Sequence, residues 1–244
     1  MKTMKTTAAV LAALVAHTVS ADVAGLVQDQ ARFFAMSGTE LMTTTLEDAE
    51  YAVIDVYVDF SAPNTSDHLN SESYLLNMFD VNVATSGIDS FVQSDLSSDG
   101  TWLPSLSGNE PAIGAYSAID SFVTINSFVG EDSALNLTLL DPGFGAGSNE
   151  DIFNENIGWY QAPPNGSGSV LADMRVWIGR FVASGEEARN NAGFEMSGTV
   201  GYDYQDGSGA FFGEASGEFS FIPAPGALAL MALGSTGLGR TRRK

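Results

Sequence analysis

The chain has 244 residues, 30 acidic against 10 basic, with a formal net charge of -20 and no cysteine. Its length fits one domain of ordinary size, and 44% hydrophobic residues are enough to form a core. The lack of cysteine excludes disulfides, a thiol nucleophile and cysteine-ligated metals. The negative charge argues against binding to nucleic acid.

The N-terminal 21 residues have the three-part pattern of a secretory signal peptide. Two lysines precede an apolar run over residues 8–16, and small residues lead up to Ala21. The run is shorter than the roughly 20 residues that a membrane-spanning helix needs, so a retained N-terminal anchor is the weaker interpretation. We predict export through the Sec translocon and a cut by signal peptidase between Ala21 and Asp22.

Residues 22–221 follow, and their apolar side chains alternate with a period of two, which indicates strands rather than helices. The strands are predicted over residues 51–60, 75–83, 121–129, 135–140, 170–182, 194–204 and 211–221. Residues 205–209 carry a hairpin signal between the last two. Helix is expected to be minor, with one turn in 23–34 and one in 110–118. The predicted fold is all-β: an antiparallel β-sandwich, jelly-roll-like.

The alternation also assigns side chains to the two faces of each strand. In 51–60, five apolar residues from Ala52 to Phe60 face the core, while Asp55 and Asp59 face solvent. In 75–83, the core residues are predicted to be Phe79, Val81 and Val83. In 170–182, they are Val170, Ala172, Met174, Val176 and Ile178.

The charge of this middle segment is more extreme than that of the whole chain. All 30 acids lie within 22–221, whereas six of the ten bases lie outside it. The four remaining bases are Arg32, Arg175, Arg180 and Arg189, which gives the segment a formal charge of -26. Such a surface is better tolerated where salt screens it, as in a saline exterior.

The C-terminal segment, residues 222–244, has three parts in a fixed order. A proline pair, Pro223 and Pro225, ends the last strand, a short apolar stretch rich in alanine and leucine follows, and four bases occupy the last five positions. Residues 221–238 are barely long enough to span a bilayer, which suits a transient anchor.

This segment resembles the PEP-CTERM sorting signal, in the Pro-Ala-Pro variant found in planctomycete proteins. Ala224 stands where the namesake motif has glutamate. The resemblance implies recognition by an exosortase, a cut near the prolines, and release to the cell surface or extracellular matrix. The residues that carry it are Pro223, Ala224, Pro225, Arg240, Arg242, Arg243 and Lys244. The alternative is a C-terminal anchor that is retained.

The middle segment is similar to a recurrent type of planctomycete PEP-CTERM ectodomain, a group without an assigned activity. The similar stretches begin at Tyr51, Ile119, Gly158 and Ile178. The resemblance therefore adds to the expected location and implies no reaction.

The scarcity of histidine argues against most hydrolytic sites. His68 is the only histidine outside the signal segment, and no Gly-x-Ser-x-Gly or His-Glu-x-x-His motif is present. Asp55 and Asp59 lie about 13 Å apart along their strand, too far for a glycosidase pair. We therefore predict a protein that is not an enzyme.

Two weaker binding sites are predicted from loop residues. Asp95, Asp99, Asp203 and Asp206 lie in loops whose carboxylates and carbonyls could bind calcium, although Asp-Gly is also ordinary turn chemistry. Trp102, Trp159 and Tyr160 are predicted to form a platform that stacks on sugars, although aromatic side chains at the edge of a core are the more common case.

The most consistent interpretation is an exported, non-enzymatic protein of the cell surface or extracellular matrix. Its partners are the Sec translocon, signal peptidase and an exosortase, and it contacts the membrane only through its C-terminus. One alternative is a carbohydrate-binding module of the exopolysaccharide. A second is a glycan-active hydrolase or lyase, which needs a cleft with two carboxylates about 5–10 Å apart.

Overall fold

The computed structural model describes residues 22–41, 46–64, 67–93, 102, 117–126, 138–141, 157–161 and 168–222. These residues form ten strands, three short 3-10 turns and one short helix. The strands are β1 (Gly25–Gln28), β2 (Arg32–Phe34), β3 (Tyr51–Asp59), β4 (Ser73–Ser86), β5 (Phe122–Val123), β6 (Thr138–Leu140), β7 (Ile157–Gln161), β8 (Arg175–Ser184), β9 (Gly193–Tyr204) and β10 (Ala210–Ser220). The helix α2 is Gly185–Arg189, and the 3-10 turns are η1 (Leu46–Asp48), η2 (Asn70–Glu72) and η3 (Ser117–Ile119).

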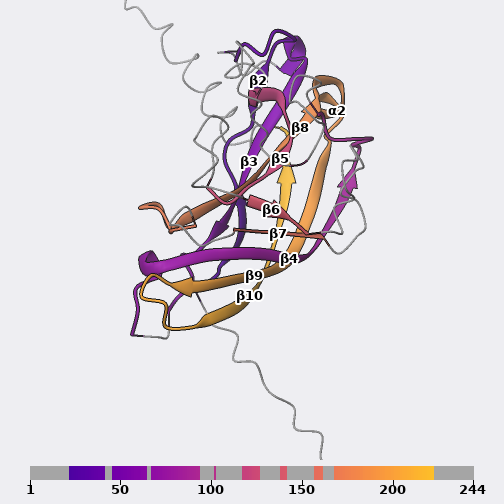
Figure 1. Ribbon diagram of the computed structural model, residues 1–244. Coiled ribbons are helices and arrows are strands. Elements are labelled where there is room, and N and C mark those ends of the chain that lie inside the picture. Colours follow the sequence, from indigo (N-terminus) through magenta and orange to yellow (C-terminus); the bar gives the residue numbers. More distant parts are fainter. Residues whose placement is uncertain are drawn as a thin grey trace, which may run out of the picture.

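The strands form two five-stranded antiparallel sheets, which confirms the predicted all-β class. Sheet A has the order β1-β3-β8-β5, with β2 also paired to β3, and sheet B has the order β10-β9-β4-β7-β6. Figure 1 shows β4, β9 and β10 as one layer, with β9 and β10 curving along their length, and β3 in the other layer. Two antiparallel sheets with one polar face each can bury their apolar faces against each other.

The inner faces of both sheets contribute to one apolar core. Ile54 and Phe181 of sheet A belong to the same buried cluster as Met78, Val81 and Phe194 of sheet B. Aromatic rings fill its middle: the Phe181 and Phe194 rings lie 4.8 Å apart between their centroids. Burial of large rings from both layers supplies the main stabilisation of a two-layer fold.

Sheet A is also covered on its outer face, which the alternation did not predict. A second buried cluster contains Phe34, Val53, Ile119 and Val182. Val53 is therefore buried on the side of β3 opposite to Ile54, and Asp55 lies on the same covered side with 8% exposure. The prediction that Asp55 belongs to a solvated acidic face is wrong, because the side chains of Arg32 and Arg180 bind its carboxylate on a face of β3 against which η3 also packs.

Irregular pairing reverses the predicted face of Phe79 in β4, whereas Val176 and Ile178 of β8 face the core as predicted. The β4–β9 register shifts between Phe79 and Asn82, where Asp80 has a φ of 51°. Met78 therefore faces the core, and Phe79 packs on the outer face against Phe212. In β8 the register shifts near Ile178, after which Phe181 and Ala183 face the core. A bulge adds one residue and reverses the alternation beyond it.

Several predicted boundaries also differ. The sequence from Leu171 to Met174 forms a turn ahead of β8, with Leu171 50% exposed, so the predicted strand begins too early. The predicted helical turn in 23–34 is wrong, because β1 and β2 occupy it. Residues 205–209 connect β9 to β10 as the hairpin signal indicated.

Helix α2 was not predicted, although its start carries a capping box. The Ser184 side chain accepts a hydrogen bond from the Glu187 amide, and the Glu187 carboxylate accepts one from the Ser184 amide at 2.9 Å. Gly185 is required here by a close approach, because a Cβ would lie 1.8 Å from the carbonyl oxygen of Ala49. The helix therefore closes one end of sheet A.

One side chain joins the two sheets at their edge. The Gln28 amide of β1 donates to the Ser220 carbonyl at 3.0 Å and accepts from the Ser220 amide at 2.8 Å. These two bonds reproduce the pairing that a neighbouring strand would make with the end of β10. We call this pair the Gln28–Ser220 latch.

Candidate functional site

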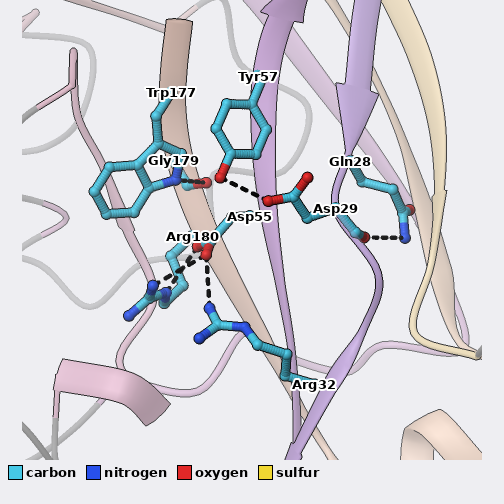
Figure 2. A network of polar contacts seen from close by, with 8 residues as sticks. All are labelled: Gln28, Asp29, Arg32, Asp55, Tyr57, Trp177, Gly179 and Arg180. Atoms are coloured by element: carbon cyan, nitrogen blue, oxygen red, sulfur yellow. Dashed lines mark hydrogen bonds and ion pairs between the residues drawn. The ribbon is translucent and has the colours of Figure 1, made fainter. Parts of the chain in front are cut away.

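The most elaborate polar cluster is centred on the carboxylate of Asp55. Arg180, opposite Asp55 on β8, donates from Nε at 2.8 Å and from Nη2 at 3.0 Å. Arg32, on β2, donates from Nη2 at 2.6 Å. Figure 2 shows the two guanidinium groups approaching the carboxylate from different sides. A bidentate arginine–carboxylate pair is among the stronger polar contacts in proteins.

Aromatic rings hold Arg180 in this position. Its guanidinium carbon lies 5.4 Å from the Trp177 ring and 5.6 Å from the Phe122 ring. The Trp177 indole in turn donates to the Gly179 carbonyl at 2.9 Å. Because the carboxylate and Arg180 are both mostly buried and well paired, this cluster serves the packing of sheet A.

A second cluster lies beside the first on the same sheet. The Tyr57 hydroxyl donates to Asp29 Oδ2 at 2.9 Å, and Arg175 Nη1 lies 3.2 Å from Asp29 Oδ1. Burial, and then the hydrogen bond to Asp29, raises the pKa of Tyr57 well above its ordinary value. Figure 2 shows the Tyr57 hydroxyl pointing at the Asp29 carboxylate, and the raised pKa keeps the phenol a hydrogen-bond donor in alkaline solution as well.

The fourth arginine also has a structural role. Arg189 Nη1 donates to the carbonyls of Leu46 at 3.0 Å and Ala49 at 2.9 Å, which ties α2 to η1. All four arginines of residues 22–221 are thus engaged within the fold.

His68 lies against the β9–β10 hairpin. Its ring stacks on Tyr204 with centroids 4.0 Å apart and an interplanar angle of 14°. Nδ1 lies 3.6 Å from a Glu72 oxygen, and Nε2 lies 3.8 Å from an Asp206 oxygen. With a carboxylate near each nitrogen, the ring connects the loop before β4 to the hairpin.

Two of the residues predicted to bind calcium shape the hairpin. Asp203 Oδ1 accepts from the Tyr204 and Gly209 amides at 2.7 and 3.0 Å, and Asp206 Oδ1 accepts from the Ser208 amide at 2.9 Å. Asp95 and Asp99 lie outside the described residues. Within the part of the chain that the structure describes, no three histidine or acidic side chains group as metal ligands would. Calcium binding at these residues stays a prediction.

The predicted sugar-stacking platform is wrong for both tryptophans. Trp102 is 2% exposed, and its ring lies 5.9 Å from that of Phe91. Trp159, on β7, is 1% exposed and donates from Nε1 to the Thr124 carbonyl at 3.1 Å. Their large apolar areas are buried in the core between the sheets. Tyr160 alone faces outward, 40% exposed.

The outer face of sheet B carries aromatic side chains that sequence reasoning did not select. The register aligns Phe212 of β10, Gly201 of β9, Asn77 of β4 and Tyr160 of β7 in one row across the sheet. Phe212 is 47% exposed. The ring of Phe79, in the next row, lies 5.8 Å from it in an edge-to-face arrangement. We call Phe79, Phe212 and Tyr160 the outer aromatic group.

A shallow hollow of about 240 Å³ continues this face toward the other end of the sheet. It is lined by Asn82, Ala84, Glu195, Ser197, Ser216 and Glu218. Glu195 and Glu218 are direct cross-strand partners, a placement in which like charges repel. The face therefore combines exposed rings at one end with hydroxyl, amide and carboxylate groups at the other.

The predicted processing residues fall at or beyond the limits of the described chain. Ala21, Pro223, Ala224, Pro225 and the terminal bases lie outside the described residues, whereas Asp22 lies inside and is fully buried. Among the described residues, no helix is both long and apolar enough to cross a membrane. Comparison with protein-family models, curated protein sequences and solved structures gives no match.

Proposed function

We propose that this chain is an exported, non-enzymatic β-sandwich that an exosortase-type system displays on the cell surface or in the extracellular matrix. The observation that carries the proposal is the position of the core relative to the two predicted processing sites. Asp22, directly after the predicted signal cut, is buried, and so is Phe221, two residues before Pro223. A core bounded in this way retains its fold when both terminal segments are removed.

The charge of the body supports the same location. Its four arginines are engaged within the fold, so the acidic side chains dominate the outside. Repulsion between copies weakens where salt reduces the screening length to roughly 10 Å or less.

Removing residues 222–244 tests the sorting step. We expect the shortened protein to leave the cells and accumulate in the medium, because the segment that the exosortase recognises is gone. Immunoblots of cells and medium measure the distribution, and a variant that replaces only Arg240, Arg242, Arg243 and Lys244 separates the role of the bases. A shortened protein that stays on the cells would overturn the proposal.

A jelly-roll-like connectivity belongs to this proposal. The consecutive strands β3 and β4 lie in different sheets, and they pair with β8 and β7, which are also consecutive in the chain. An antiparallel ribbon that is rolled into two layers produces such pairs.

The outer aromatic group favours a second candidate, the binding of a neutral glycan. Exposed rings stack on the apolar faces of sugars, and the only side chain in the row between Phe212 and Tyr160 is that of Asn77, whose amide lies over Gly201. The strongly negative body would repel an anionic polymer. The neighbouring serine, asparagine and glutamate side chains can hydrogen-bond to sugar hydroxyls.

We expect the double variant Phe212→Ala, Tyr160→Ala to lose retention on a column of a neutral polysaccharide that retains the unmodified protein. Leu69→Ala is the control, because Leu69 is an exposed apolar residue outside the sheets, directly before η2, and is 67% accessible. Equal retention of all three proteins would exclude this candidate.

A further inference from the structure

The carboxylate of Asp22 is buried without a complete set of partners. The residue has 0% exposure. Oδ2 accepts a hydrogen bond from the Tyr204 hydroxyl at 2.8 Å, while Oδ1 has no hydrogen-bond partner. A buried carboxylate oxygen in this state is costly, because it has given up water without a replacement.

None of the described basic side chains pairs with Asp22. Arg32 and Arg180 bind Asp55, Arg175 binds Asp29, and Arg189 binds backbone carbonyls. His68 stacks on the ring of Tyr204 and lies near Glu72 and Asp206 instead. The described chain therefore supplies no counter-charge for this carboxylate.

We propose that the cut after Ala21 supplies the missing counter-charge. The new α-ammonium group of Asp22 then pairs with the buried carboxylate of the same residue and completes the fold. This inference rests on the proposed signal cleavage. In the uncut chain the same nitrogen is a neutral amide, whereas cleavage turns it into a cation with three donors. The nitrogen and the carboxyl group belong to one residue, so no rearrangement of the fold is needed to bring them together.

The surrounding contacts hold Asp22 in place for this pairing. The Ala24 amide donates to the Asp59 carbonyl at 2.7 Å, and Val23 packs against the core. Tyr204 is 3% exposed and fixes one oxygen of the carboxylate. The mature N-terminus is thus a buried structural element rather than a free end, and cutting must precede complete folding.

A four-protein cycle tests the pairing directly. Chains 22–244 and 21–244 are released from a removable fusion partner, each with Asp22 or with Asp22→Asn, and urea unfolding is followed by tryptophan fluorescence. With Asp22, we expect the chain that begins at residue 22 to have an unfolding equilibrium constant about 10- to 100-fold smaller than the chain with Ala21, the range of a charge-assisted hydrogen bond. With Asp22→Asn, the difference should fall to about twofold or less.

Labelling the amines gives a second measurement, which does not depend on the folding of the Asp22→Asn variants. The chain from residue 22 contains one lysine, Lys244, so its side chain serves as the internal reference. Relative to Lys244, the α-amine of Asp22 should react with an acetylating ester more slowly than that of Ala21. Any of three results would overturn the pairing. The α-amines of Asp22 and Ala21 could react at equal rates, or the two proteins with Asp22 could be equally stable. Ala21 could also change the stability of the Asp22→Asn proteins as much as that of the Asp22 proteins.

Failure of the proposed signal cleavage would appear in a different experiment. N-terminal sequencing of the protein recovered from its native cells reports whether Asp22 is the first residue in vivo. The four-protein cycle instead uses N-termini that are produced in vitro. A native N-terminus other than Asp22 and the lack of an ammonium–carboxylate pair can therefore be told apart.

Discussion

Replacing Asp55 with alanine should lower the free energy of unfolding by about 3–5 kcal/mol, the range for breaking a buried ion pair by removing one of its members. Arg180 would lose both of its bonds to this carboxylate while its side chain stays 13% exposed. Arg32, whose side chain is 33% exposed, can turn to water and should contribute less. Urea denaturation monitored by circular dichroism measures the change.

Two further variants separate charge removal from loss of the pair. Glu218→Ala removes an acid from an exposed position opposite Glu195, and it should leave stability unchanged or slightly higher because a repulsion is relieved. Asp55→Leu combined with Arg180→Met removes both partners and should recover much of the loss. A single Asp55→Ala change within about 0.5 kcal/mol of the unmodified protein would show that the cluster is not a structural centre.

Replacing Phe221 with alanine should also lower the free energy of unfolding by about 3–5 kcal/mol, as for other fully buried phenylalanines. The ring is 0% exposed and lies 6.1 Å from that of Phe194. Its amide donates to the Ala192 carbonyl, so the residue closes the core at the end of β10. The same urea experiment measures the effect.

The control for Phe221 is a chain that ends at this residue. Because the proposed sorting segment starts at residue 222, ending the chain there should leave the free energy of unfolding unchanged within about 0.5 kcal/mol. A large loss on truncation would mean that residues after Phe221 belong to the folded body. No loss for Phe221→Ala would mean that the core ends earlier.

The regular parts of the fold could be predicted because two-residue alternation is a direct consequence of a half-buried strand. The predicted strands 194–204 and 211–221 match β9 and β10 within one residue at each end. The inward set of the predicted strand 51–60, from Ala52 to Phe60, is buried as predicted. In β9 and β10 one face lies in the core and the other is largely exposed, so the local pattern alone reveals the buried side chains.

The errors arise where distant segments decide burial. The bulge beside Asp80 reverses the face of Phe79, and its residues look like any other strand residues in the sequence. Asp55 is buried because Arg32 of β2 and Arg180 of β8 bind its carboxylate on a face that η3 also packs against, which no pattern within β3 reveals. Trp102 and Trp159 stand next to loop residues in the sequence but pack into the core. Their environment depends on the sheet pairing, which a single sequence does not contain.

The candidate sites were harder to predict than the strands, for the same reason. The row that contains Phe212 and Tyr160 exists only once β10, β9, β4 and β7 are in register. Asp22 was selected as a cleavage residue, and its bond to Tyr204 joins positions 182 residues apart. By contrast, the capping box that starts α2 at Ser184 is local, and it could have been found.

The Gln28–Ser220 latch has a mechanical consequence under the proposed display, in which the chain is held to the cell through its C-terminal end. A pulling force from the tether would enter at Phe221 and Ser220, next to the latch. Ser220 is paired with Gly193 in sheet B and with Gln28 in sheet A, so the load divides between both layers at its point of entry. A force that separates β10 from sheet B, starting at Ser220, would have to break the pairing with Gly193 and the bonds to Gln28 at the same time.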